Sequence, residues 1–302
     1  MKEADRFRGC LLGLAVGDAV GTTLEFKARE EFSPISDMVG GGPFRLNAGE
    51  WTDDTSMALC LATSLVDKAG FDPQDQMERY CRWWKDGYLS SNGRCFDIGN
   101  TVRAALRQFQ TTGNPIAGST NSHSAGNGCI MRLAPVPMFY YPDHAAAIRF
   151  SAESSRTTHG AQECIDACRL LAGIIIRALS GLSKEEVLLG DRELFDGEPK
   201  IVVLARGAYR DKSETAIQGT GYVFHSLEAA LWCFYQTEDF RAAILKAANL
   251  GDDADTTAAI CGQVAGAYYG EEGIPPPWLN RLVMRREISS LADRLFQTQQ
   301  LM

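Results

Sequence analysis

Two short acidic segments, one early and one late in the chain, constrain how this sequence can fold. The first is Thr52-Asp53-Asp54-Thr55 and the second is Asp252-Asp253-Ala254-Asp255-Thr256-Thr257. Each leads directly into an apolar pattern of helical period. Because Ser, Thr and Asp satisfy the free amides at a helix N-terminus, two ordinary N-caps are the simplest interpretation.

A shared metal site is the alternative, and the crowding of the carboxylates favours it. One Asp or Thr is enough for a cap, and a helix dipole offers only about half a positive charge to the other acids. If the fold brings both segments together, burying so much negative charge requires a cation. Because ligand sets made only of oxygen select hard metals, the expected ions are Mg²⁺ or Mn²⁺.

Helical spacing of apolar residues recurs along the whole chain, whereas alternating patterns are rare. In the first expected helix, over residues 4–20, Gly9, Gly13 and Gly17 share one face and predict a close contact with another helix. Lys200–Leu204 allows a short strand, but its neighbours favour helix. The fold class is therefore expected to be all-α, a compact bundle of about ten or more helices. The other main helices are expected over 55–68, 73–86, 101–109, 143–155, 161–180, 225–236, 239–249, from the second acidic segment to about Tyr269, and over 278–296.

No linker or repeat divides the chain, and we expect residues 1–302 to form a single domain. A division into two domains would leave each half with an incomplete acidic site, because the two segments lie so far apart in the sequence. The formal net charge of −8 argues against a nucleic-acid partner, since phosphate contacts need Lys and Arg.

Cysteine usage and the N-terminus predict a cytoplasmic protein. The nine cysteines are odd in number, form no Cys-x-x-Cys motif and lie mostly in apolar runs, as expected for buried thiols in a reducing compartment. The N-terminus is charged and lacks a signal-peptide core. No apolar run approaches the roughly 18 residues that a membrane span needs. We expect a monomer.

Two polar loops are candidates for ligand binding. Gly126-Asn127-Gly128 permits left-handed backbone and a close approach of amides to a ligand, although a plain turn explains it equally well. His159, before Gly160, could contact a ligand or cap a helix.

Taken together and in this order, several segments resemble the ADP-ribosylglycohydrolase family. They are Gly9-Cys10-Leu11-Leu12-Gly13-Leu14-Ala15-Val16-Gly17-Asp18-Ala19, Trp51-Thr52-Asp53-Asp54-Thr55, Gly126-Asn127-Gly128 and Asp253-Ala254-Asp255-Thr256. Each alone is unspecific, but the combination is specific and extends over nearly the whole chain. The likeness is strongest to the branch of the dinitrogenase reductase-activating glycohydrolases. It implies an all-α fold of that family's type with a dinuclear Mg²⁺ or Mn²⁺ site. The implied reaction removes ADP-ribose from a mono-ADP-ribosylated arginine of a target protein, by cleavage of the N-glycosidic bond.

The resemblance also implies which residues form the site. The metal ligands would be Thr52, Asp53, Asp54, Asp253, Asp255 and Thr256. Asp252 falls where many relatives have glycine and is not assigned to the metals. The catalytic carboxylates would be Glu25 and Asp97. Substrate would contact Asn100, Gly126, Asn127, Gly128, His159 and Tyr222, the last by stacking on adenine.

Several roles stay open at this point. Glu25 would act as a base toward water or a ribose hydroxyl, and Asp97 would orient the guanidinium or pass a proton to it. From the residues alone, Glu25 could equally be a solvated loop acid and Asp97 an N-cap of the helix near Thr101. For Tyr222, the residues alone favour a core side chain over stacking. Cys129 stands where relatives often carry a smaller residue or serine, which affects the expected shape of the glycine loop.

Other functions remain alternatives. The linkage cleaved could be serine-linked, polymeric or O-acetyl-ADP-ribose. The chain could also be a non-catalytic ADP-ribose-binding or structural member of the family, or a dinuclear phosphohydrolase that releases AMP. The expected partner is an ADP-ribosylated protein, with nitrogenase reductase as one candidate, and the expected product is free ADP-ribose.

Overall fold

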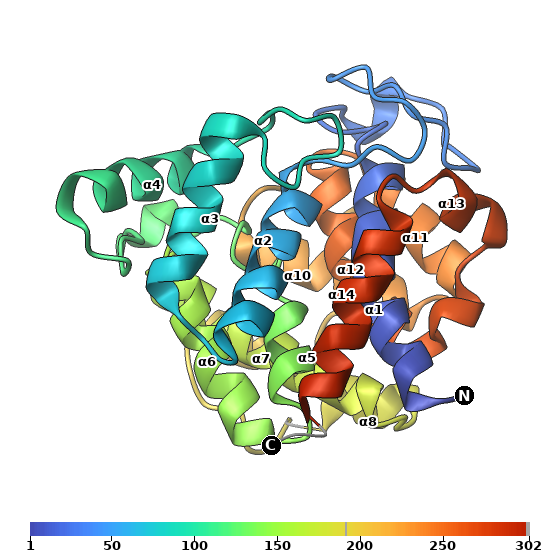
Figure 1. Ribbon diagram of the computed structural model, residues 1–302. Coiled ribbons are helices and arrows are strands. Elements are labelled where there is room, and N and C mark those ends of the chain that lie inside the picture. Colours follow the sequence, from blue (N-terminus) through green and yellow to red (C-terminus); the bar gives the residue numbers. More distant parts are fainter. Residues whose placement is uncertain (191, 300–302) are drawn as a thin grey trace.

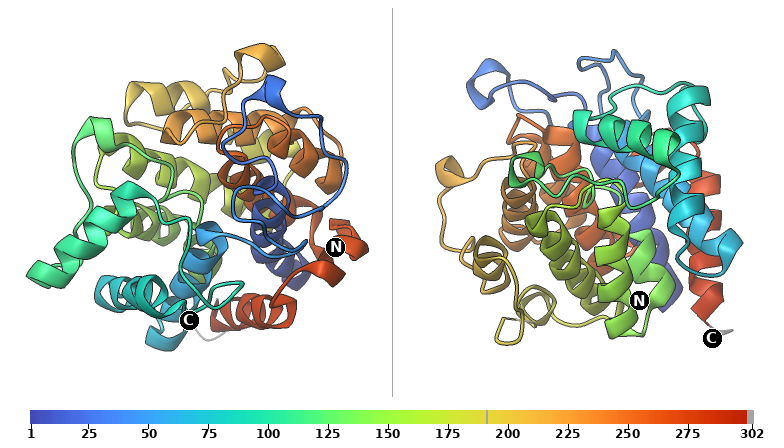
Figure 2. Two further views of the ribbon diagram at one scale, coloured as in Figure 1. Left: turned by 90° about the horizontal axis from the view of Figure 1, so that it is seen from above. Right: turned by 90° about the vertical axis from the view of Figure 1, so that its left-hand side faces the viewer.

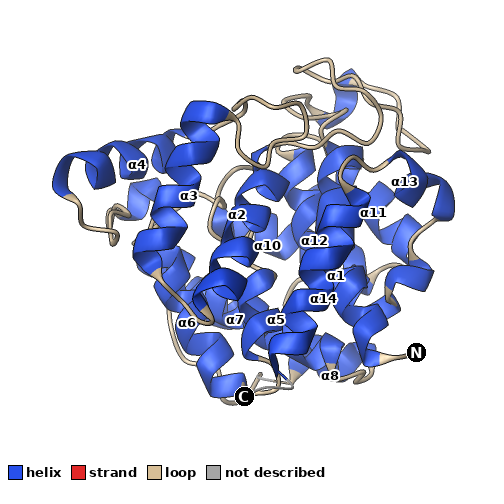
Figure 3. Ribbon diagram, viewed as in Figure 1, coloured by secondary structure: helices blue, strands red, loops and turns tan. Residues whose placement is uncertain are grey.

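The computed structural model describes residues 1–190 and 192–299. Within these ranges the structure contains 14 α-helices and no β-strand, which confirms the all-α prediction (Figure 3). The helices are α1 (Glu3–Gly21), α2 (Asp53–Lys68), α3 (Pro73–Asp86), α4 (Asn100–Thr112), α5 (Pro135–Tyr140), α6 (His144–Arg156), α7 (Gln162–Leu179), α8 (Lys184–Leu189), α9 (Pro199–Ala205), α10 (Val223–Tyr235), α11 (Phe240–Ala248), α12 (Ala254–Tyr269), α13 (Pro276–Arg281) and α14 (Arg285–Gln299).

The two helices α1 and α12 pack backbone to backbone through their small residues. A Cβ atom added to Gly13 would lie 2.3 Å from the carbonyl oxygen of Gly262, far inside van der Waals contact. At Gly17 the corresponding distance, to the carbonyl oxygen of Ala258, is 2.1 Å. The contact predicted from the glycine spacing is therefore confirmed, and its partner is the helix that follows the second acidic segment.

This antiparallel contact determines where the acidic segments lie. The C-terminal end of α1 at Gly21 touches Ala254 and Asp255 at the start of α12. Figure 1 shows α1 between α12 and α14, with the long α1–α2 loop and the α3–α4 loop at the same end of the bundle. Figure 2 gives the same loops from above and from the side.

The core consists of one large apolar cluster and a smaller one. The large cluster takes residues from most helices, with α7, α10 and α12 almost fully buried along their lengths. The smaller cluster joins α2, α3 and α4 through side chains such as Cys60, Tyr80 and Leu106. It positions the α3–α4 loop over the start of α2.

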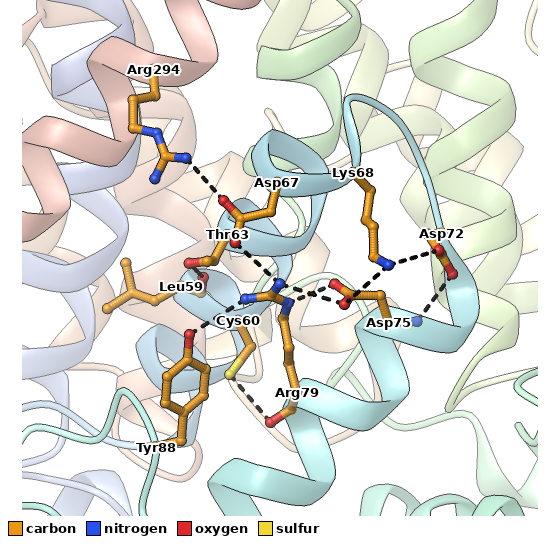
Figure 4. Close-up of polar contacts among 10 residues, drawn as sticks. All are labelled: Leu59, Cys60, Thr63, Asp67, Lys68, Asp72, Asp75, Arg79, Tyr88 and Arg294. Atoms are coloured by element: carbon orange, nitrogen blue, oxygen red, sulfur yellow. Dashed lines mark hydrogen bonds and ion pairs between the residues drawn. The ribbon is translucent and has the colours of Figure 1, made fainter.

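An ion-pair network holds the far end of α2. Asp67, near the C-terminus of that helix, accepts from Arg79 of α3 at 3.1 Å and from Arg294 of α14 at 2.9 Å (Figure 4). Arg79 also donates to Asp75 at 2.6 Å. Because the pairs are partly exposed, each contributes only modestly to the stability of the fold. Together they hold α2 between α3 and α14.

The structure differs from the expected helices in three places. Lys200–Leu204 lies in the helix α9 and forms no strand. A short helix, α5, occupies residues for which no helix was expected, starting at Pro135, where proline suits the first helical turn. The final helix is interrupted between α13 and α14, because the amide of Val283 donates to the carbonyl of Gly49 and Met284 adopts a φ of 56°.

Of the helices in the described ranges, none is both long and apolar enough to cross a membrane.

Candidate active site

Five segments bring acidic side chains to the end of α1. Asp18 comes from α1 itself, Asp53 and Asp54 from the start of α2, and Asp255 from the first turn of α12. Glu25 lies in the loop after α1, and Asp97 lies in the loop before α4. The fold therefore joins the two acidic segments that the sequence separates.

The hydroxyl of Thr52 lies among three carboxylates. Its Oγ1 atom is 2.9 Å from Asp18 Oδ1, 3.1 Å from Asp255 Oδ2 and 3.3 Å from Asp54 Oδ2. A hydroxyl has one proton and can donate to only one of these oxygens. The lone pairs of Thr52 therefore face carboxylate oxygens, an arrangement that a cation between them would stabilise.

Two of these carboxylates have an oxygen with no partner at all. Asp54 Oδ1 and Asp255 Oδ1 are buried, and neither has a hydrogen-bond donor among the described residues. Thr256 Oγ1 lies 3.4 Å from the other oxygen of Asp54. Because an unpaired buried charge is very costly, these oxygens fit the ligand set of a hard cation.

The N-cap interpretation of the acidic segments does not hold. Elsewhere, Asp72, Asp143 and Asp239 each accept a hydrogen bond from an amide in the first turn of their own helix. Thr52 and Asp253 occupy the corresponding positions of α2 and α12, yet neither side chain caps its helix in the part of the chain described.

Asp18 is the site residue that sequence reasoning missed. It is fully buried, and its Oδ1 atom accepts from the amide and hydroxyl of Thr52, both at 2.9 Å. Its Oδ2 atom accepts from the amide and hydroxyl of Thr55, at 3.0 and 2.6 Å. Asp18 thus caps α2 from another helix. Burial raises its pKa to about 6, against the opposing effect of these hydrogen bonds. The available signal was one carboxylate in the otherwise apolar stretch of α1 from Gly9 to Gly21.

Glu25 and Asp97 face each other at the opening of the acidic site. One ligand atom from each, with one from Asp255, lies within 4.8 Å of the other two. Burial raises the pKa of Glu25 to about 10, and the charges of Asp97 and Asp253 add to the effect. Burial likewise raises the pKa of Asp97 to about 7.

The simpler interpretations of these two acids are wrong. Glu25 is only 3% exposed and so is no solvated loop acid. The amide of Phe26 donates to the carbonyl of Asp252 at 2.7 Å, which ties the Glu25 loop to the second acidic segment. Asp97 does not cap α4, because Gly99 occupies the N-cap position. The Asp252 side chain is exposed, in keeping with its omission from the ligand set.

A cavity of about 380 Å³ opens over these acids. It is lined by Glu25, Asp53, Asp97, Asn100, Gly126, Asn127, Gly128, His159, Asp253 and Thr256, among others. All the expected catalytic and substrate residues except Tyr222 therefore lie around one space. Thr52, Asp54 and Asp255 lie buried beneath it.

The Gly126–Gly128 loop contacts both the second acidic segment and His159. Asn127 Nδ2 donates to Asp253 Oδ2 at 2.7 Å and to Ser226 Oγ at 2.8 Å, so this side chain points toward the acidic site. A Cβ atom on Gly128 would lie 2.8 Å from His159 Cε1. Glycine at this position lets the imidazole pack directly under the loop.

His159 is a buried, neutral ring and caps no helix. Its Nδ1 atom pairs with Thr158 Oγ1 at 2.8 Å, and that hydroxyl accepts from Arg132 at 2.8 Å. Burial lowers the pKa of His159 to about 4. In the tautomer whose Nδ1 accepts from the Thr158 hydroxyl, Nε2 carries the proton and can donate into the cavity.

Tyr222 lies in a second, adjoining cavity of about 620 Å³. The two cavities share Thr101, Gly126 and Gly221 in their walls. The Tyr222 hydroxyl contacts Glu163 and, at 2.7 Å, Lys200. Tyr222 is only partly buried, which excludes a role purely in the core. Its two charged partners, Glu163 and Lys200, were not predicted from the sequence.

Comparisons with known proteins agree with this geometry. The family model described as ADP-ribosylglycohydrolase matches residues 1–302. The chain is 48% identical over 293 residues to the ADP-ribosylarginine hydrolase Tri1 of Pseudomonas putida (strain GB-1), covering 97% of this chain and 78% of that protein. It is 32% identical over 303 residues to the ADP-ribosyl-[dinitrogen reductase] glycohydrolase of Rhodospirillum rubrum, covering 96% and 95%. A solved structure, described as an ADP-ribosylglycohydrolase-related protein complex, superposes with a TM-score of 0.87 at 42% identity, covering 98% of both chains.

Proposed function

Because the chain belongs to the ADP-ribosylglycohydrolase family, we propose that it is an ADP-ribosylarginine hydrolase that removes ADP-ribose from arginine side chains of a modified protein. The structural observation that carries this proposal is the junction of the two acidic segments beneath an open cavity. There Thr52 lies among three carboxylates, two of which keep an unpaired buried oxygen. A non-catalytic scaffold has no need for such a cluster.

The proposed cofactor is a pair of Mg²⁺ or Mn²⁺ ions. Its ligands would be Thr52, Asp53, Asp54, Asp253, Asp255 and Thr256. When bound, the ions would supply positive charge that orients ribose hydroxyls and a water molecule. The unpaired oxygens of Asp54 and Asp255 support this assignment, since they require a positive partner.

The carboxylates at the opening are suited to proton transfer. Cleavage of the N-glycosidic bond develops positive charge at the anomeric carbon, as in other glycoside hydrolyses. In the proposed mechanism the positive charge of the bound ions would favour the ionised form of Glu25, which would accept a proton from water or from a ribose hydroxyl. Asp97 orients the guanidinium by a charge-assisted hydrogen bond, or passes a proton to it as it leaves.

The rest of the cavity would hold the ADP part. The Gly126–Gly128 loop would approach the diphosphate and ribose closely, with His159 donating from Nε2. Tyr222 would stack on the adenine in the adjoining cavity, which shares walls with the first.

Release of free ADP-ribose from an ADP-ribosylarginine peptide tests the proposal. The reaction is run with Mg²⁺, with Mn²⁺ and with EDTA, and a serine-linked peptide is run in parallel. We expect metal-dependent release from the arginine peptide. Release only from the serine peptide would reassign the linkage, and release of AMP would indicate a phosphohydrolase.

The remaining expectations are also proposals. We propose that the target is an ADP-ribosylated protein, and the name of the Rhodospirillum relative makes nitrogenase reductase one candidate. Seven of the nine cysteines are buried as small apolar side chains, which supports a reducing compartment and hence the cytoplasm. The single domain over 1–302 and the monomeric state remain predictions.

A further inference from the structure

Three phenylalanine rings gather at the opening of the acidic cavity. The ring centroids of Phe44 and Phe96 are 5.2 Å apart, and those of Phe26 and Phe44 are 6.4 Å apart. Phe26 directly follows Glu25, and Phe96 directly precedes Asp97. The aromatic cluster therefore borders the two proposed catalytic acids.

Phe26 is held outward at this border. It is 67% exposed, and its backbone has a φ of 62°, which is unfavourable for a bulky side chain. The hydrogen bond from its amide to Asp252 maintains that conformation. An exposed ring in a strained backbone conformation beside an active site suggests a binding function.

Each ring has a basic neighbour in the chain. Lys27 follows Phe26, Arg45 follows Phe44, and Arg94 lies two positions before Phe96. All three basic residues are exposed, and within the described ranges their side chains make no ion pair or hydrogen bond. In a chain with a net charge of −8, three unpaired cations beside an acidic cavity leave positive charge available to a partner.

We propose that these six residues form a rim surface that binds the polypeptide around the modified arginine, and that this surface prefers acidic and apolar flanking residues. The rim surface consists of Phe26, Lys27, Phe44, Arg45, Arg94 and Phe96. The inference rests on the proposed function, because that function requires a polypeptide at the cavity opening.

The arrangement of the two cavities places the polypeptide on this side. The second cavity, with Tyr222, adjoins the first at Gly126 and Gly221, where the ADP part is assigned. Phe26 lines the first cavity and is absent from the lining of the second. With ADP directed toward Tyr222 and the ribose over the acids, the arginine leaves past Glu25 and Asp97, where the rim surface begins.

The test compares three substrates: free ADP-ribosylarginine, a peptide with the modified arginine between Asp, Glu and Leu residues, and a peptide with Lys in place of the acids. The variant combines Lys27→Gln, Arg45→Gln and Arg94→Gln. In the triple variant, the ratio of kcat/KM for the acidic peptide to kcat/KM for free ADP-ribosylarginine should be about tenfold lower than in the wild type. Exposed charge pairs mainly raise the association rate and add only modestly to affinity. The Lys peptide should change little.

Arg206→Gln is the matched control, because Arg206 is also exposed, lies at the C-terminal end of α9 and lines neither of the two cavities. It should leave all three rates unchanged. Phe44→Ala tests the aromatic part and should raise KM for both peptides, with little effect on the free substrate.

Equal losses on all three substrates, or an unchanged ratio of peptide to free substrate, would overturn the inference. So would binding of a DNA oligonucleotide that the triple variant loses while the peptide ratio stays the same. If wild-type protein hydrolyses none of the arginine substrates, the proposed function itself fails, and that result is distinct from a failure of the rim surface.

Discussion

The hydroxyl oxygen of Thr52 lies 3.1 Å from a carboxylate oxygen of Asp255, although 203 positions separate the two residues in the sequence. Neither side chain caps its own helix, and both point into the same acidic centre. This contact joins the starts of α2 and α12 at one point.

Replacing Asp255 with Asn should abolish metal binding and activity without unfolding the protein. We expect at least a ~100-fold loss of kcat, because one charged ligand is removed. In EDTA the variant should melt at or above the wild-type temperature, since repulsion among buried acids is reduced. When Mn²⁺ is present at 100 times its Kd, the free energy of unfolding of the wild type should rise by about 2.7 kcal/mol, whereas that of the variant should rise little.

Asp252→Asn is the control for that experiment. Asp252 is exposed, and Asn tolerates its φ of 55°. Activity and the effect of Mn²⁺ on melting should match wild type. Full activity in Asp255→Asn would refute the ligand assignment.

The metal-free protein should lose stability as the pH rises. Burial, with the neighbouring acids, raises the pKa of Glu25 to about 10 and that of Asp97 to about 7. The folded state therefore binds protons more tightly than the unfolded state. The resulting stability is complete below pH ~4 and is lost as the pH rises toward those values, by up to about 1.4 kcal/mol per pH unit for each group.

Melting in EDTA measures this effect. Between pH 5 and pH 8 the melting temperature should fall, and added Mn²⁺ should restore more stability at pH 8 than at pH 5. A flat profile in EDTA would contradict the acidic centre described above.

Asp18→Asn should destabilise the protein and weaken metal binding. At pH 8 the Asp18 carboxylate accepts four hydrogen bonds from Thr52 and Thr55, and an amide nitrogen cannot accept two of them. The free energy of unfolding in EDTA should fall by about 1–3 kcal/mol. Urea unfolding measures it, and a more stable variant would mean that charge repulsion outweighs these hydrogen bonds.

Gly13→Ala should separate α1 from α12. Its Cβ atom would meet the carbonyl oxygen of Gly262 at 2.3 Å, and backbone atoms cannot rotate away. We expect a loss of about 3 kcal/mol or more in the free energy of unfolding. Gly70→Ala is the matched control, because a Cβ atom at Gly70 would lie 4.0 Å from its nearest neighbour, the hydroxyl oxygen of Tyr140. This substitution should change the free energy of unfolding little.

Tyr222→Leu should weaken substrate binding selectively. Stacking of a base on an aromatic ring contributes about 1–3 kcal/mol, so KM for ADP-ribosylarginine should rise about tenfold while kcat changes little. Steady-state kinetics separate the two constants. An unchanged KM would remove Tyr222 from the substrate site.

Local patterns were enough to predict most of the longer helices and one long-range contact. The spacing of Gly9, Gly13 and Gly17 predicted a close partner for α1, because only a backbone can fill that face. It could not identify α12 as the partner, since several helices carry small residues. The break before Met284 depends on a hydrogen bond to Gly49, which no local pattern contains.

The candidate site shows the same limit. The acidic segments predicted a shared centre because crowded carboxylates need a cation. Asp18 was missed because its partners, Thr52 and Thr55, approach from another helix. The rim surface was missed for a similar reason, since Phe26 and Phe44 lie far apart within the α1–α2 loop and Phe96 comes from the α3–α4 loop.

The packing of α1 on α12 also orders events during synthesis. When α1 leaves the ribosome, the helix that must cover its glycine face has not yet been translated. The first acidic segment then has no counterpart, and a nascent chain that stops before Asp253 lacks the second acidic segment altogether. Catalytic competence therefore arises only after nearly the whole polypeptide has been made, so truncated products of interrupted translation are inactive.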